Sequence, residues 1–255
     1  MNACRCVLLV AAAVANSGLA AERYEGYAYA LDGERLLYRE THWLYEGERP
    51  ERLVVYRCPD GSPFARKRVT DVDRAHAPDY AFSDARDGHR EGVRSTAGRR
   101  DVYWQDRDGT DRVERSLVID PDTVIDAGFD AYIREHWDAL AAGTPLSARL
   151  LLPSRLGTIG VRISDATSPA DRRMALRRMS VQLDAWYAFA LPSLSLVYDR
   201  ARNLREFRGV GPVRDRHGRN LSVLIRFPAE PLLQPASRDE VEAAARAPLD
   251  GTCRL

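Results

Sequence analysis

The chain has 255 residues, of which 45% are hydrophobic and 29% are charged, and its formal net charge is +1. This composition is typical of a soluble globular protein with a sizeable core. The balance of charge excludes a global field that would attract nucleic acid or an anionic membrane. The basic residues are almost all arginine, and Lys67 is the only lysine. We interpret the basic segments 65–68 and 172–178 as solvated faces.

Residues 1–20 have the pattern of a secretory signal peptide. Arg5 and the amino terminus supply positive charge, an apolar run follows at 7–15, and small residues stand at Gly18 and Ala20. Nine apolar residues are too few to anchor the chain across a bilayer. We therefore expect cleavage after Ala20 or one residue later. The mature chain is expected to be exported and periplasmic, without a lipid anchor or a transmembrane segment.

Two cysteines remain after this cleavage, Cys58 and Cys253, because Cys4 and Cys6 leave with the leader. In an oxidising compartment two cysteines usually pair. The sequence therefore favours a disulfide between the front of the chain and its C-terminal tail, with two separate buried thiols as the alternative.

From residue 22 to residue 119, short apolar or aromatic runs alternate with turn residues such as Asp32-Gly33, a hairpin signal. Loops this short cannot support crossover connections, so the strands should form an antiparallel meander. The predicted strands are 24–31, 35–45, 53–58, 64–72, 78–86, 90–94, 102–105 and 113–119.

Residues 123–143 predict one long amphipathic helix. Asp122 or Thr123 can cap its first turn, and Gly143 ends it. Its aromatic face either plugs the core on one face of a sheet or forms the floor of a cavity for an apolar ligand. The residues that fall three or four apart on this face are Phe129, Ile133, Trp137 and Leu140.

The second half of the chain predicts further strands and a short helix at 184–191. Ser237 and Glu240 form a capping-box pattern that opens a C-terminal helix to about residue 246. No repeat or linker divides the chain, so residues 21–255 are predicted to form one domain. The predicted strands are 147–152, 158–164, 172–182, 193–198, 204–213 and 220–227. The stretch 172–182 also fits a helical face, with 168–171 as its start, but its alternating apolar residues favour a strand.

Three stretches of this half carry a family resemblance: LLLPSRLGTIGVRI at 150–163, LPSLSLVYD at 191–199 and LREFRGVGPVRDRHGRN at 204–220. They resemble a family of uncharacterised exported bacterial proteins, itself similar to the lipoprotein-localisation (LolA/LolB-like) half-barrel superfamily. This resemblance implies a curved antiparallel sheet with helices across its concave face and non-covalent binding of an acyl chain. It brings no catalytic residue. Gly211-Pro212 departs from the family pattern, in which Asn more often follows the second glycine.

Catalytic and metal sites have no support in the sequence. The five histidines are scattered without metal-ligand spacing, and no G-x-S-x-G nucleophile motif occurs. We therefore predict no cofactor, no metal, no catalytic residue and no enzymatic activity.

The sequence thus predicts a mainly β (α+β) fold, a curved antiparallel sheet or half-barrel with one long helix and short helices on its concave face. The predicted function is a non-catalytic periplasmic carrier for a lipid or another apolar ligand. An envelope assembly or scaffold protein with a filled core is the alternative, and an unrecognised hydrolase is a third possibility. The predicted ligand-lining residues are Phe129, Ile133, Trp137, Leu150, Leu152, Ile159, Val161, Trp186 and Phe189.

Overall fold

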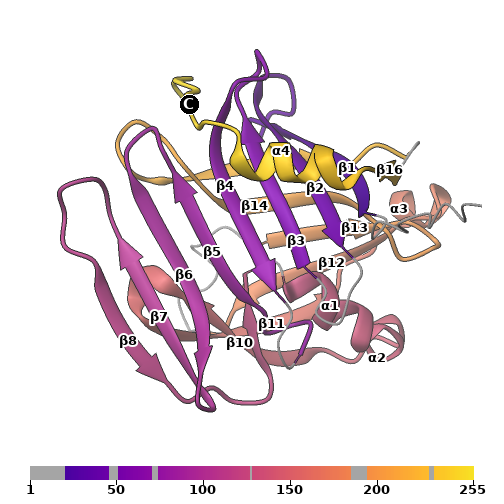
Figure 1. Cartoon of the computed structure of the whole chain (residues 1–255). Coiled ribbons are helices and arrows are strands. Elements are labelled where there is room, and N and C mark those ends of the chain that lie inside the picture. The colour runs from indigo at the N-terminus through magenta and orange to yellow at the C-terminus, as the bar shows by residue number, and fades with distance from the viewer. Residues whose placement is uncertain (1–20, 46–50, 71–73, 127, 185–193, 230–232) are drawn as a thin grey trace, which may run out of the picture.

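The computed structural model describes residues 21–45, 51–70, 74–126, 128–184, 194–229 and 233–255. Over these residues it shows one large, curved, open sheet that is almost entirely antiparallel, with short helices packed against it (Figure 1). The predicted mainly β fold is confirmed. The predicted leader at 1–20, most of the predicted helix at 184–191, and the candidate residues Trp186 and Phe189 lie outside the described residues.

The predicted meander forms half of the sheet. Its strands pair consecutively and antiparallel, as the short turns between them require. Gly33 has φ of 80°, which the predicted Asp-Gly hairpin turn needs. The strands are β1 (Ala21–Tyr29), β2 (Leu36–Tyr45), β3 (Glu51–Arg57), β4 (Pro63–Thr70), β5 (Asp79–Asp84), β6 (His89–Thr96), β7 (Arg99–Gln105) and β8 (Val113–Leu117).

The second half of the sheet joins the first through a β1–β15 pair, so the strand order runs β8 to β1 and then β15 to β9. The strands are β9 (Thr123–Ile125), β10 (Leu146–Leu152), β11 (Gly157–Asp165), β12 (Arg177–Leu183), β13 (Leu194–Tyr198), β14 (Leu204–Arg214), β15 (Asn220–Arg226) and β16 (Gln234–Ala236), which pairs with β1. A 3-10 turn at Pro153–Arg155 separates β10 from β11.

The prediction of one continuous helix over 123–143 is wrong. Residues Thr123–Ile125 form β9, parallel to β10, because a run of Thr, Val and Ile suits a strand better than a helix. The helical part is broken at His136 into α1 (Gly128–Glu135) and α2 (Trp137–Ala141). Its predicted end is confirmed, since Gly143 has φ of 84°. The remaining helices are α3 (Pro169–Arg173) and α4 (Arg238–Arg246).

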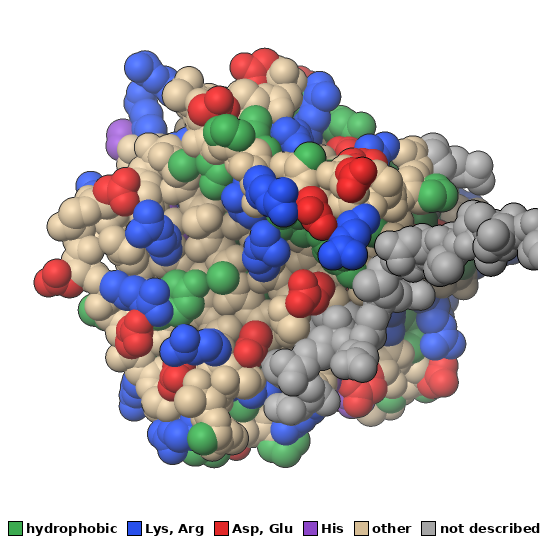
Figure 2. Space-filling model, viewed as in Figure 1, with side chains coloured by type: hydrophobic (Ala, Val, Ile, Leu, Met, Phe, Trp, Pro, Cys, Tyr) green, Lys and Arg blue, Asp and Glu red, His purple; other side chains and the backbone are tan. Residues whose placement is uncertain are grey.

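The two faces of the sheet carry different layers. On β3, Val54 and Tyr56 face the core on the concave side, whereas Leu53 and Val55 face α4 on the outer side. Figure 1 shows α4 crossing this outer side, and Figure 2 shows acidic and basic side chains interspersed around it. The Ser237 hydroxyl accepts a hydrogen bond from the Glu240 backbone N–H, as the capping pattern predicts.

The concave side holds two neighbouring cores. The first core lies mainly on the meander and includes Tyr38, Tyr56 and Phe82. The second core lies between α1–α2 and strands β10 to β13. Strand β9 and the last part of β10 are buried on both faces, because Val124 belongs to the second core whereas Ile125 and Leu151 belong to the first.

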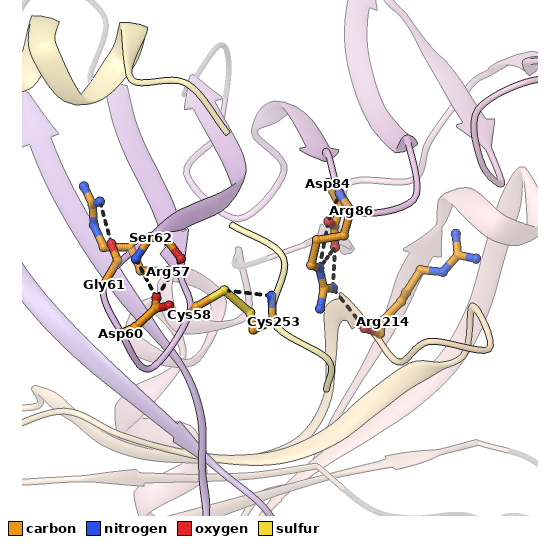
Figure 3. The surroundings of a disulfide bond; sticks show 9 residues. All are labelled: Arg57, Cys58, Asp60, Gly61, Ser62, Asp84, Arg86, Arg214 and Cys253. Atoms are coloured by element: carbon orange, nitrogen blue, oxygen red, sulfur yellow. Dashed lines mark hydrogen bonds and ion pairs between the residues drawn. A yellow bond between two sulfur atoms is a disulfide. The ribbon is translucent and has the colours of Figure 1, made fainter. Parts of the chain in front are cut away.

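The predicted disulfide between Cys58 and Cys253 is confirmed, and it joins residues 195 apart in sequence. Figure 3 shows Cys58 just beyond the end of β3 and Cys253 in the tail that follows α4. Gly251 permits this close approach, because a Cβ there would lie 2.8 Å from the Ser62 carbonyl oxygen. The bond fastens the tail to the first core.

Candidate functional site

The helix pair α1–α2 covers the concave side of the second half of the sheet, and its apolar face is the one the sequence predicts. Phe129, Ile133 and Trp137 are buried in the second core, together with Val161 of β11. Leu150 and Ile159 are partly buried against the same core. Leu152 is half-buried at the end of β10 and is not in this core. The structure thus brings six of the candidate residues together.

Trp137 is enclosed by residues of its own chain. Its ring makes an edge contact with Tyr198, with 5.4 Å between the ring centroids. The guanidinium groups of Arg202 and Arg177 lie 5.2 and 5.8 Å from the indole centroid. These cations stabilise the ring electrostatically. The indole therefore belongs to a packed contact among α2, β13 and two arginines.

Next to this apolar core lies a buried cation that the sequence analysis assigned to a solvated face. That assignment of 65–68 is wrong for Lys67, which is 5% exposed, and for Ala65, which is fully buried. Lys67 Nζ lies 2.6 Å from Asp126 Oδ1, in the segment that leads into α1. It also lies 5.5 Å from the ring centroid of Tyr80. Lys67 therefore links the meander to the start of the helix cover.

The far end of α1 has a second polar attachment. His76 is buried, and its Nδ1 lies 3.0 Å from Glu135 Oε2, while its Nε2 lies 3.0 Å from the Pro121 carbonyl oxygen. A Cβ at Gly128 would lie 2.1 Å from the His76 carbonyl oxygen, so only glycine permits this approach of α1. One acidic side chain before α1 and one at its end thus tie the helix to the meander.

A further buried polar group lies on the concave side of β1 and β2. His42 Nε2 lies 3.0 Å from Glu40 Oε2, and the His42 ring stacks on Tyr24 with centroids 4.4 Å apart. Burial lowers the pKa of His42, and the adjacent Glu40 offsets only part of that effect. His42 Nδ1 is buried without a hydrogen-bond partner among the described residues. The concave side of the meander therefore buries polar and charged side chains beside its apolar core.

Sequence reasoning missed this charged set because alternation by itself does not reveal which face of a strand is enclosed. One signal was present. Lys67 is the only lysine in an arginine-rich chain. It also lies opposite Val54 of β3 and Phe82 of β5, which places its side chain on the concave side.

Two open grooves lie elsewhere, on the outer side of the sheet. One, of about 340 Å³, lies over β4 to β8 beside Tyr103 and Arg112. The other, of about 580 Å³, lies over β1 and β12 to β15. Of the predicted ligand-lining residues that the structure describes, none lines either groove.

The described residues show neither a metal-binding cluster nor a membrane-spanning helix, and the chain matches no known protein. Among the described residues no cluster of three or more His, Cys, Asp or Glu side chains could hold a metal ion. None of the described helices is both long and apolar enough to span a bilayer. No protein-family model matches the chain, and neither a curated protein nor a solved structure is significantly similar to it.

Proposed function

We propose that the protein is a non-catalytic binding or carrier protein for an apolar ligand, which takes the place of α1–α2 on the concave side of the sheet. The observation that carries this proposal is the second core. One wall of that core is the apolar face of the short helices, and the other is the concave face of β10 to β13. An acyl chain can cover the same surface, because apolar burial is non-directional.

The contacts that hold α1 against the sheet can be broken and formed again. A buried ion pair such as Lys67–Asp126 adds little net stability over an apolar pair of similar volume, yet its loss on one side is costly. Such a pair favours one position of α1 on the sheet, but it adds too little stability to prevent the helix from leaving that position. Asp126 also has φ of 48°, a left-handed conformation that costs a non-glycine residue about 1 kcal/mol. These features support a cover that can be displaced.

Export to the periplasm is part of the same proposal. A disulfide persists in oxidising compartments, so the Cys58–Cys253 bond is consistent with secretion through the predicted leader. The curved sheet with helices on its concave side is also the architecture that the family resemblance implies. The scaffold alternative gains no specific support, because the large exposed apolar side chains of the described residues, such as Leu31, Val118 and Met174, lie in different connecting segments of the chain.

The single lysine provides a direct test. The purified mature protein is treated with an amine-acetylating reagent, with and without the uncharged apolar fluorophore N-phenyl-1-naphthylamine, and acetylation of Lys67 is followed by peptide mass spectrometry. The expected result is saturable fluorescence and faster acetylation of Lys67 when the fluorophore binds, because displacement of α1 exposes the amine. The amino terminus of the same chain serves as the control for the reagent.

The variant Asp126→Asn should raise the rate of Lys67 acetylation in the absence of ligand. Asp138→Asn is the matched control, since Asp138 is an exposed carboxylate on α2 that pairs only loosely with Arg202. Binding of the fluorophore with no change at Lys67, or no binding at all, would contradict the proposal. Mass spectrometry of lipids extracted from protein isolated from the cell envelope would then identify the natural ligand.

A further inference from the structure

The larger outer groove, of about 580 Å³, contains a row of side chains that crosses five adjacent strands. The residues directly opposite one another along this row are Tyr27 of β1, Arg226 of β15, Glu206 of β14, Val197 of β13 and Arg178 of β12. Directly opposed residues of antiparallel strands share a face, so this row forms the floor of the groove. The volume is within the range of small-molecule sites.

The apolar part of the groove is substantial. Tyr29 of β1 adds a second aromatic ring beside Tyr27. Met174, which follows α3, lines the opposite wall and is one of the most exposed large apolar side chains among the described residues. An apolar ligand body would remove these side chains from water.

The positive charge of the groove is only partly matched by its carboxylates. Arg178 is engaged, because its Nε and Nη2 atoms lie 3.2 and 3.0 Å from the two oxygens of Asp171. This hydrogen bonding holds the pKa of Asp171 well below its usual range. Glu206 lies 3.8 Å from Arg178 and 4.0 Å from Arg226, and both distances exceed hydrogen-bond length.

Arg226 is the cation that faces the groove with the weakest attachments. Its side chain is 52% exposed. Besides the 4.0 Å contact with Glu206, it makes a 3.5 Å contact to the Gly33 carbonyl oxygen, and its guanidinium lies 5.3 Å from the centroid of Tyr29. A guanidinium in this position can receive a carboxylate or phosphate with two parallel hydrogen bonds.

We propose that the outer groove is a ligand site for a single-chain amphiphile with an anionic head group. The head group binds Arg226, and the chain lies over Tyr27, Tyr29 and Met174. This inference is separate from the proposed function, because the groove lies on the opposite face of the sheet from α1–α2 and needs no displacement of the helices.

The test compares three ligands with the same ten-carbon chain: decanoate, decanol and decyltrimethylammonium. Each is titrated into the mature protein below its micellar concentration, and backbone amide shifts are followed by NMR. Decanoate is expected to bind at least ten-fold more tightly than the other two, with the largest shifts on β1, β14 and β15. Equal binding of the three ligands, or shifts confined to α1 and β10–β13, would overturn the inference. Shifts confined to those elements would instead support the concave site.

The matched variants are Arg226→Gln and Arg208→Gln. Arg208 lies on the same outer face of β14, but it donates to the Leu31 carbonyl oxygen and does not line the groove. Arg226→Gln should weaken decanoate binding at least five-fold and leave decanol binding unchanged, whereas Arg208→Gln should change neither. An unchanged decanoate affinity in a folded Arg226→Gln protein would refute the site. If that variant does not fold, Arg226→Lys, which keeps the charge and loses the paired donors, should still weaken binding.

Discussion

The two halves of the concave side differ in the side chains that they bury. The side against α1–α2 is apolar, with Ile133 and Met179 fully buried among aliphatic and aromatic neighbours. The side formed by the meander buries Lys67, Glu40 and His42 next to its apolar core. The two halves meet at α1, whose approach segment supplies Asp126 to Lys67. In the carrier that we propose, the apolar half would provide the binding energy, while the charged half holds the helix in position.

The largest loss of stability is expected when the disulfide that fastens the C-terminal tail to the charged half is removed. Replacing Cys58 and Cys253 together by serine removes a cross-link between residues 195 apart. The chain-entropy model gives a loss of about 5 kcal/mol in the free energy of unfolding. Urea unfolding of the oxidised wild type and the double variant measures this loss. A loss below about 1 kcal/mol would show that the C-terminal tail is held by its other contacts, such as the hydrogen bond of Arg66 to the Ala247 carbonyl oxygen.

The second-largest expected loss of stability tests whether the buried Lys67–Asp126 ion pair holds α1 in its position. Lys67→Met should lower the free energy of unfolding by about 4 kcal/mol, because Asp126 stays charged in a buried place but loses its ion pair with Lys67. The pair of changes Lys67→Met and Asp126→Asn should cost clearly less than the sum of the two single changes. Strict additivity in urea unfolding would mean that the two residues stabilise the fold independently.

A smaller loss of stability is expected when a buried side chain of the apolar half is shortened. Ile133→Ala should cost about 3 kcal/mol and Ile133→Val about 1 kcal/mol, since the loss follows the volume of the cavity left in the second core. Val118→Ala, at a side chain that is 74% exposed, is the control and should change stability by less than about 0.5 kcal/mol. If Ile133→Ala costs no more than this control, the helix cover is loosely packed even without ligand.

The smallest effect concerns pH. Because burial lowers the pKa of His42 in the folded state, the unfolded chain binds the proton more readily. The contribution of His42 to the free energy of unfolding is therefore fully present above the ordinary histidine pKa of about 6.5. It is lost as the pH falls from there toward the lower pKa of His42 in the folded state. Unfolding free energy should therefore fall on acidification, and His42→Gln should flatten this slope. Val118→Ala, at an exposed side chain that does not titrate, should leave the slope unchanged.

Local features of the chain determined most of the secondary structure. Hairpin turns such as Asp32-Gly33 force neighbouring strands to pair, so the meander could be predicted from turn spacing and alternation. Ser237 and Glu240 predicted the start of α4, and Gly143 predicted the end of the helix pair. The pairing of Cys58 with Cys253 followed from counting the cysteines that lie beyond the predicted leader.

Tertiary structure decided what local pattern leaves open. Thr123–Ile125 became a strand because β10 offered an edge with which it could pair, a contact that residue spacing does not show. Lys67 became buried because the sheet curves and brings Asp126 to it from 59 residues away. The row from Tyr27 to Arg178 exists because β1 pairs with β15, which joins β1 to the four consecutive strands β12 to β15 far along the chain. Alternation assigns side chains to one of two faces, but only the curvature of the sheet and the segments packed on it decide which face is enclosed and which charges meet.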